Sequence, residues 1–446
     1  MTKNTDAREI VVDALVEILE KEGYSHKVLS QALSKYQYLE KQERSFITRV
    51  TEGTIEYLIQ IDSVLDSCLK TKVKKMKPVI RTMLRMSVYQ ILYMDRVPDS
   101  AVCNEAVKLA AKRGFVGLKG FVNGVLRTIV REKERFQWDD DSLKYSMPSW
   151  LLDLWKKAYG RKTAITIAEA FLNPSRLTVR CNLDRASKED ILKSLKSQGA
   201  AVSESQISSA ILYLDRMDYL ECLEAFQKGW IQVQDLSSSL VGEAADPNPG
   251  SYVIDVCGAP GGKSLHIADK LKNTGMVEVR DLTWQKVSLI QENIARTGYK
   301  NIFAKAWDAL VLDEDSIEKA DLVLADLPCS GLGIIGRKPE IKYRMTADKL
   351  KELAALQREI LSVVQSYVKP GGKLIFSTCT INPMENEENR NWFLKNYPFE
   401  PVSLEEKLGT AFKEPSLKDG YIQLLPGIHP CDGFFIAAFK KGIKDE

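Results

Sequence analysis

The chain has 446 residues, of which 44% are hydrophobic and 28% are charged, with a formal net charge of +3. This length predicts two or three domains, and this composition supports buried cores and excludes a disordered protein. No apolar run approaches the length of a membrane span, and acids interrupt the apolar N-terminal stretch, which excludes a secretion signal. We therefore expect a cytoplasmic protein with no membrane partner.

The cysteines and histidines argue against a metal site. None of the eight cysteines forms a C-x-x-C pair, and the three histidines, His26, His266 and His429, lie far apart in the chain. Scattered cysteines in a reducing compartment are free thiols, and the ligand spacing of a zinc site is missing. We expect no bound metal.

Residues 1–138 are predicted to form an all-α domain. In REIVVDALVEILEKEGY the apolar positions recur every three and four residues, and Gly23 supplies a stop. Similar runs follow as far as GFVNGVLRTIVREKERF, and WDDDS marks the end of the domain.

Positive charge concentrates in this helical region, because residues 70–135 contain 16 Lys/Arg against 5 Asp/Glu. A solvated helical face would explain such a run. Contact with nucleic-acid phosphates would also explain it, since clustered cations release counterions from the backbone. Charge alone leaves both readings open, and our candidates for RNA contact are Lys70, Lys72, Lys74, Lys75, Lys77 and Arg337.

Residues 144–232 are predicted to form a small α+β module of the ferredoxin or RRM-like kind. LTVRCNL has the composition of a strand, SKEDILKSLKSQG that of a capped helix with a glycine stop, and AILYLDR that of a second strand.

Residues 233–446 alternate between strands and helices. YVIDVC, MVEVRD, NIFAKAWDA, ADLVLADLP and GKLIFSTCT read as strands, a long helix spans about 346–368, and GFFIAAFKK closes the series. Such alternation predicts a mostly parallel, doubly wound α/β sheet of the Rossmann-like kind, in which ligands bind at the carboxyl ends of the strands.

The segment DVCGAPGGKS, which follows the first strand, is close to a phosphate-binding loop. Gly262, Lys263 and Ser264 fit that motif, but Cys257 stands in place of its first glycine. Asp281 and Asp308 follow the next two strands, where acids would repel a triphosphate but suit the ribose hydroxyls and the sulfonium of S-adenosylmethionine. One such feature alone could be a turn or a helix cap. A fourth feature is the pair ADLPCSG and STCT, which follow two later strands. Because four such features occur at successive strand ends, we favour a nucleoside cofactor without phosphates.

Cys329 and Cys379 follow two strands that should be neighbours, so we expect both thiols to face one crevice. Carbon 5 of a pyrimidine is a weak nucleophile, and a thiolate that adds to carbon 6 activates it. Asp326 could hydrogen-bond the ring nitrogen, and the second thiol could assist removal of the carbon 5 proton. The base must first leave its stack, and we expect room for it between the two sulfurs.

Three segments, DVCGAPGGKS, DLVLADLPCSGLGIIGRKPEIKYR and FSTCTINPMENEEN, resemble the signatures of S-adenosylmethionine-dependent RNA cytosine-5 methyltransferases with two active-site cysteines. The N-terminal part, with NEAVKLA and GFVNGVLR, is similar to the NusB-like RNA-binding domain. The order of the domains resembles the RsmB (Sun) type of 16S ribosomal RNA methyltransferase.

The resemblance implies that Cys379 is the nucleophile and that Cys329 assists product release. It also implies an S-adenosylmethionine site formed by Cys257, Gly258, Ala259, Pro260, Gly261, Gly262, Lys263, Asp281, Asp308 and Asp326. Lys263 would have no phosphate to hold, and either the cofactor carboxylate or a thiolate could be its partner.

The implied substrate is 16S ribosomal RNA, free or in the pre-ribosomal small subunit, with cytosine 967 as the family's expected target. We expect a monomer. Three alternatives stay open: a cytosine-5 methyltransferase for another rRNA or tRNA site, a P-loop triphosphatase, and a non-catalytic RNA-binding or antitermination factor.

Overall fold

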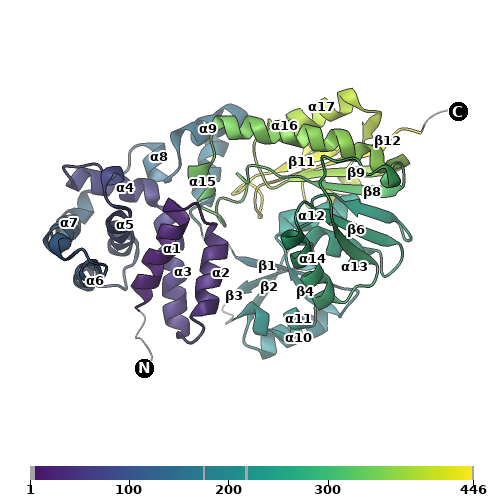
Figure 1. Cartoon of the computed structure of the whole chain (residues 1–446). Helices are drawn as coiled ribbons and strands as arrows, with labels where there is room; N and C mark the ends of the chain where they lie inside the picture. Colours follow the sequence, from purple (N-terminus) through teal and green to yellow (C-terminus); the bar gives the residue numbers. More distant parts are fainter. Residues whose placement is uncertain (1–5, 174–175, 216–218, 444–446) are drawn as a thin grey trace. The chain divides into compact units, whose positions relative to one another are not determined.

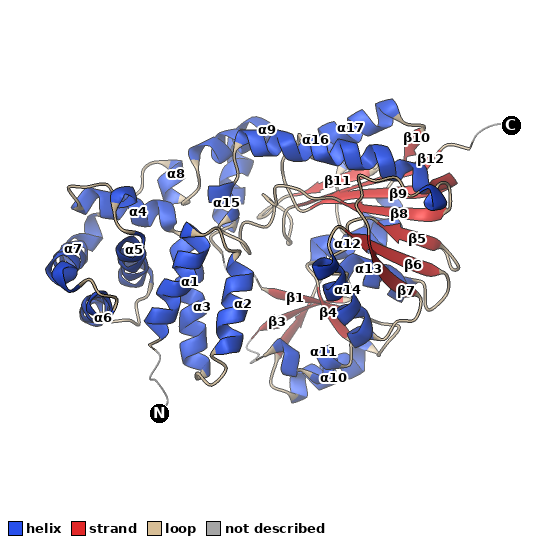
Figure 2. Ribbon diagram, viewed as in Figure 1, coloured by secondary structure: helices blue, strands red, loops and turns tan. Residues whose placement is uncertain are grey.

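The computed structural model describes residues 6–173, 176–215 and 219–443, and their elements are drawn in Figures 1 and 2. They form two compact units. One comprises Met1–Asn173 together with Ile335–Arg344, and the other comprises Pro174–Ile334 and Met345–Glu446. Among the described helices, none is long and apolar enough to cross a membrane.

The first unit is helical, as the sequence predicts for residues 1–138. It also includes the helix at residues 149–170, which the sequence assigns to the α+β module. Its core contains fully buried side chains such as Leu15, Ile61, Met83 and Leu126, and each such side chain stabilises the fold by roughly 1.5–3 kcal/mol. The apolar run RSFITRVTEGTIEYLIQIDSVLDSCL forms two helices that are separated at Tyr57. The helices are α1 (Ala7–Glu20), α2 (Ser25–Lys35), α3 (Lys41–Glu56), α4 (Leu58–Cys68), α5 (Pro78–Tyr93), α6 (Asp99–Lys112), α7 (Lys119–Glu132), α8 (Asp141–Lys144), α9 (Ser149–Ala170) and α15 (Ile341–Arg344).

The second unit begins with a four-stranded antiparallel sheet in the order β2-β3-β1-β4. Its elements are β1 (Leu177–Cys181), α10 (Lys188–Ser197), β2 (Ala201–Glu204), β3 (Ile211–Asp215), α11 (Glu224–Gln227) and β4 (Ile231–Val233). This chain order is that of a ferredoxin-like module. Ser187 caps α10 by accepting a hydrogen bond from Asp190 N. On the inner face of the helix, the side chain of Ile191 is buried in the core of this module.

The larger sheet has the order β10-β12-β9-β8-β5-β6-β7, and β11 also pairs with β12. Strands β5 to β9 run parallel to one another, whereas β12 runs antiparallel to β9, β10 and β11. The strands are β5 (Tyr252–Asp255), β6 (Met276–Asp281), β7 (Ile302–Ala306), β8 (Ala320–Asp326), β9 (Val368–Thr378), β10 (Phe399–Pro401), β11 (Tyr421–Leu424) and β12 (Phe434–Lys441).

Helices cover both faces of this sheet, as Figure 2 shows. Alternate strand residues point to opposite faces, so Val253 packs with α12, α13 and α14 while its neighbour Ile254 packs with α16 and α17. The helices of this unit are α12 (Leu236–Ala245), α13 (Gly262–Lys270), α14 (Trp284–Thr297), α16 (Ala347–Val364), α17 (Glu387–Asn396) and α18 (Glu405–Leu408). The doubly wound α/β prediction is thus confirmed.

One boundary differs from the prediction. The helix expected to reach residue 368 ends at Val364, and β9 begins at Val368, ahead of Pro370-Gly371-Gly372. The pairing of β8 with β9 shifts register between Ala320 and Leu322. The sequence predicts that the Pro-Gly-Gly segment is a loop between the helix and the strand. In the structure this segment lies inside β9, as an irregularity of the strand.

Candidate active site

The carboxyl ends of the parallel strands bring the predicted site residues to one edge of the sheet. β5, β6 and β8 each end in an aspartate, namely Asp255, Asp281 and Asp326, and Cys379 directly follows β9. From β5 the sheet extends through β6 and β7 on one side and through β8 and β9 on the other. The loop after β5 therefore starts at the point where the strand order reverses, the usual ligand position in such sheets.

This loop, residues 256–261, is shaped by two glycines. A Cβ on Gly258 would lie 2.2 Å from Val279 Cγ1, and Gly261 has a φ of +103°, so both positions favour glycine. Gly258 N donates to Arg280 O at 2.9 Å, and Ala259 N donates to the Asp281 carboxylate at 3.0 Å. The loop is thereby fastened to the end of β6, and α13 starts directly after it.

Asp281 and Asp308 lie at the ends of two adjacent strands. Asp281 is buried and accepts hydrogen bonds from Ala259 N and Leu282 N, while Lys286 Nζ lies 2.9 Å from it. The half-buried Asp308 accepts a hydrogen bond from Leu310 N at 2.9 Å. Leu282 and Leu310, which follow these acids, are 59% and 40% exposed. Carboxylates flanked by accessible apolar side chains suit a nucleoside, with its sugar hydroxyls and apolar base faces.

Asp255 is a site residue that the sequence reasoning missed. It is 1% exposed, it accepts a hydrogen bond from Ser264 Oγ in the first turn of α13, and its Oδ1 has no hydrogen-bond partner among the described residues. Burial raises its pKa to about 7. The signal was present in the sequence, because Asp255 ends the first strand as Asp281 and Asp326 end later ones.

Lys263 reaches from the loop to Asp326. Its Nζ lies 2.7 Å from Asp326 Oδ2, and Ser377 Oγ donates to Asp326 Oδ1 at 2.7 Å. Burial would lower the pKa of Lys263, but the Asp326 carboxylate, with smaller contributions from Cys379 and Asp255, holds it above its ordinary value. The ammonium therefore stays charged and favours the thiolate form of Cys379.

The two predicted cysteines meet. Cys329 Sγ and Cys379 Sγ lie 3.3 Å apart, and both residues are half-buried. The hydrogen bond with Cys379, and then burial, raise the pKa of Cys329 well above its ordinary value, so Cys329 stays protonated. The expected gap between the sulfurs is not present, because at this distance they touch. A base can pass between them only after one side chain moves.

The residues expected to contact RNA lie in the helical unit. Lys70, Lys72, Lys74, Lys75 and Lys77 are all exposed and follow one another between α4 and α5. Within this group Lys72 Nζ lies 3.4 Å from Asp66, and Lys77 Nζ lies 5.5 Å from the centre of the Phe115 ring. Arg337 lies in the segment Ile335–Arg344, which folds with the same unit.

Known protein families match nearly the whole chain. Residues 243–440 match the family described as 16S rRNA methyltransferase RsmB/F, residues 5–131 match the NusB family, and residues 147–219 match the ferredoxin-like domain of RsmF/B-like methyltransferases. The probable ribosomal RNA small subunit methyltransferase B of Bacillus subtilis is 37% identical over 98% of this chain and 99% of its own length. The chain belongs to the RsmB/F methyltransferase family. It is an enzyme that uses S-adenosylmethionine as its methyl donor.

The similar proteins include a second curated relative and two solved structures. The probable ribosomal RNA small subunit methyltransferase B of Synechocystis is 30% identical over 98% of this chain and 99% of its own length. The crystal structure of PH0851 has a TM-score of 0.85 at 27% identity, covering 99% of this chain and 100% of that one. A methyltransferase homolog protein from Pyrococcus horikoshii has a TM-score of 0.58 at 29% identity, covering 68% of this chain and 98% of that one.

The residues at the sheet edge fit this cofactor. Because Gly258 has no side chain and packs closely on Val279, the backbone of the loop lines the cofactor edge of the sheet. The carboxylates of Asp281 and Asp308 suit hydroxyl and amino groups better than phosphates. When bound there, S-adenosylmethionine supplies an electrophilic methyl group. The residues that would hold it are those predicted, from Cys257 to Lys263 together with Asp281, Asp308 and Asp326.

Proposed function

We propose that this enzyme methylates carbon 5 of a cytosine in 16S ribosomal RNA through a covalent bond between Cys379 and carbon 6. The observation that carries the proposal is the contact of two cysteine sulfurs, 3.3 Å apart, beside the acids of the cofactor edge. The names of the family and of its curated relatives support ribosomal RNA of the small subunit as the substrate. Cytosine 967 is the family's expected target, and an rRNA substrate implies a cytoplasmic location.

The surroundings of the two thiols support different roles for them. Lys263 places a positive charge near Cys379, whereas the pKa of Cys329 is raised. Cys379 therefore attacks carbon 6 as a thiolate, and the ring nitrogen takes up a proton from water and donates it in a hydrogen bond to the Asp326 carboxylate. Carbon 5, now nucleophilic, accepts the methyl group. Cys329 then releases its own proton to water and takes up the carbon 5 proton. The double bond between carbons 5 and 6 re-forms, Cys379 leaves as a thiolate, the ring nitrogen returns its proton to water, and the methylated base leaves.

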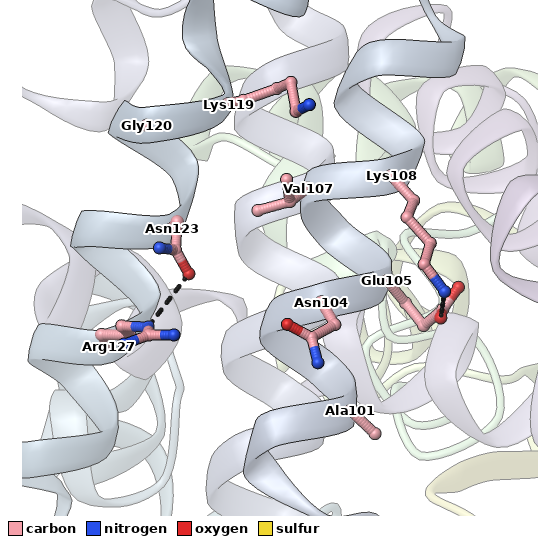
Figure 3. A pocket seen from close by; sticks show the side chains of 9 residues that line it. All are labelled: Ala101, Asn104, Glu105, Val107, Lys108, Lys119, Gly120, Asn123 and Arg127. Carbon is pink, nitrogen blue, oxygen red and sulfur yellow. Dashed lines mark hydrogen bonds and ion pairs between the residues drawn. The ribbon is translucent and has the colours of Figure 1, made fainter.

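The helical unit offers a second basic surface for RNA, a groove of about 590 Å³ between α6 and α7 (Figure 3). Lys119 and Arg127 on α7 lie across it from Lys108 on α6, whose charge is paired with Glu105 at 2.7 Å. A Cβ on Gly120 would meet no atom within 4 Å, so the floor of the groove at α7 is open. Cations along an open groove suit an RNA backbone. We propose that this groove and the Lys70–Lys77 stretch hold the RNA around the target.

The proposal is tested with Cys379→Ala and Cys329→Ala variants, labelled S-adenosylmethionine and 16S rRNA, either free or in small-subunit particles. We expect Cys379→Ala to lose both methyl transfer and the covalent RNA adduct. Cys329→Ala should accumulate an adduct that is stable in denaturing gels, since its release is impaired. Full turnover by Cys379→Ala would overturn the assignment.

The family and the cofactor exclude two of the alternatives, a P-loop triphosphatase and a non-catalytic RNA-binding factor. The third alternative, a cytosine-5 methyltransferase for another rRNA or tRNA site, predicts methylation of a different RNA position. Bisulfite sequencing of ribosomal RNA from cells with and without the protein identifies the methylated cytosine.

A further inference from the structure

A buried acid lies behind the two cysteine-bearing loops. Glu385, in the turn between β9 and α17, is fully buried, and its carboxylate accepts four hydrogen bonds. None of the chemistry proposed above uses it. Burying a carboxylate is unfavourable unless its oxygens are hydrogen-bonded, so its partners indicate what it does.

The first partner belongs to the Cys329 loop. Ser330, the residue after Cys329, donates its backbone N–H to Glu385 Oε2 at 2.8 Å and its hydroxyl to Glu385 Oε1 at 2.5 Å. The carboxylate therefore holds both the backbone and the side chain of this residue.

The second set of partners belongs to the Cys379 loop. Asn382 donates its amide to Glu385 Oε1 at 2.9 Å. The hydroxyl of Thr380, the residue after Cys379, lies 2.7 Å from the hydroxyl of Ser330. Since Ser330 gives its only hydroxyl proton to Glu385, Thr380 must be the donor in that contact. Glu385 thus fixes the direction of a hydrogen-bond chain that joins the two loops.

The third partner comes from α16. Gln357 Nε2 donates to Glu385 Oε2 at 3.3 Å and to the carbonyl of Pro328, the residue before Cys329, at 2.9 Å. Asn389 of α17 in turn donates to Gln357 Oε1 at 2.8 Å. With two donors on each oxygen, the carboxylate has no acceptor site left for a substrate.

We propose that Glu385 is a positioning residue that sets the separation of the Cys329 and Cys379 sulfurs by tying their loops together through Ser330 and Thr380. Its hydrogen bonds go to residues next to the cysteines and not to the cysteines themselves, although its charge contributes to the raised pKa of Cys329. The expected loss of methyl transfer rests on the proposed function. The expected change in the distance between the two sulfurs does not depend on it.

The test is the Glu385→Gln variant, which keeps the shape of the side chain. Whichever oxygen becomes an NH₂ group, it faces two donors, either the Ser330 hydroxyl with Asn382 or the Ser330 N–H with Gln357. Glu388→Gln is the matched control, because Glu388 is exposed and only three residues away.

The main readout is disulfide formation between Cys329 and Cys379 in the full chain, with oxidised glutathione as the oxidant. One thiolate attacks glutathione disulfide and releases one glutathione, and the other thiolate then displaces the second glutathione to close the protein disulfide. Closure requires the sulfurs to be close. Mass spectrometry of the linked peptides measures its rate.

We expect closure to be at least tenfold slower in Glu385→Gln than in the natural protein and unchanged in Glu388→Gln. Methyl transfer by Glu385→Gln should show a similar fall in kcat, with the KM for S-adenosylmethionine within about twofold of normal. Closure at the natural rate in folded Glu385→Gln would overturn the proposal.

A second variant covers the case in which Glu385→Gln does not fold. Ser330→Ala removes only the hydroxyl between Glu385 and Thr380 and should slow closure in the same direction, and an unchanged rate would contradict the proposal. If closure slows in these variants but the natural protein forms no covalent RNA adduct, the proposed function fails and the positioning role stands.

Discussion

A single lysine distinguishes two cysteines that otherwise look equivalent in the sequence. Lys263 stands where a P-loop lysine would hold phosphate, yet it is paired with Asp326 at 2.7 Å and lies 5.2 Å from the centre of the Phe434 ring. The ion pair keeps the lysine charged inside a largely enclosed site. Its field acts on Cys379, so one residue both explains the near-match to the P-loop motif and supports the choice of nucleophile.

At the same scale, Asp255 makes stability depend on pH. Its folded-state pKa is raised to about 7, whereas an aspartate in an unfolded chain ionises near pH 4. The folded form therefore keeps its proton where the unfolded form has lost it. The resulting stabilisation is complete below about pH 4, is lost progressively as the pH rises to about 7, and is then constant.

Asp255→Asn removes this titration because an amide does not ionise. We expect the free energy of unfolding of Asp255→Asn, relative to that of the natural protein, to rise between pH 4 and pH 7 and to level off above. Urea unfolding of both proteins at several pH values measures the difference, and groups common to both cancel. A difference that does not vary with pH would contradict the pKa of about 7.

At the scale of elements, the parallel strands were predictable because buried strands in this fold are short, continuous apolar runs. YVIDVC and ADLVLADLP became β5 and β8, and their terminal residues Asp255 and Asp326 fell at the expected edge. The edge strand β2 was not predicted. Three of its four residues are exposed, so it carries almost no hydrophobic signal.

Two features of the second unit depend on contacts between distant segments, and no local pattern could reveal them. Glu385 lies in a polar turn, and its importance appears only when the Cys329 loop, 55 residues earlier, packs against it. The contact of the two sulfurs likewise follows from the pairing of β8 with β9. Sequence placed both cysteines at the same edge but predicted a gap where the structure has contact.

The groove between α6 and α7 allows a test of RNA binding. Replacing Lys119 and Arg127 with alanine should weaken RNA binding and make it less sensitive to salt. Each phosphate contact contributes about 0.7–0.9 to the slope of log K against log salt concentration. We therefore expect the slope to fall by about 1.5 in the double variant, measured by filter binding or anisotropy.

The control for that experiment removes two cations from the exposed surface of α9. A Lys157→Ala/Lys162→Ala variant makes the same change in net charge outside the groove, at residues that are both exposed. Its salt slope should stay at the natural value. Equal slopes for the two double variants would mean that the groove makes no specific contribution.

At the scale of the whole molecule, the segment Ile335–Arg344 folds with the helical unit although it lies within the methyltransferase sequence. Glu340 accepts hydrogen bonds from Ser25 N at 2.9 Å and from Ser25 Oγ at 2.8 Å. Lys342 is 2% exposed and donates to the carbonyls of Glu56 and Ser146 at 2.8 and 2.6 Å. Every one of these partners belongs to the first 173 residues.

A fragment that begins at residue 174 removes these partners. We expect trypsin to cut it rapidly after Lys342 and Arg344, whereas in the full chain both sites should be protected, because Lys342 is buried and Arg344 donates to the carbonyls of Ile18 and Gly23. Peptide mass spectrometry over a time course gives the rates. Cleavage after the exposed Lys351 should proceed equally in both proteins. Persistent protection of Lys342 in the fragment would contradict this account.

Because the chain passes between the two units more than once, the helical unit is difficult to lose or exchange by recombination. A module joined at one end can be lost or exchanged by a single recombination event at that junction. Here the polypeptide passes between units at residues 173/174, 334/335 and 344/345, and Ile335 is only six residues beyond Cys329. A descendant that discarded the NusB-like half would also have to redesign the ten codons for residues 335–344, beside the Cys329 loop.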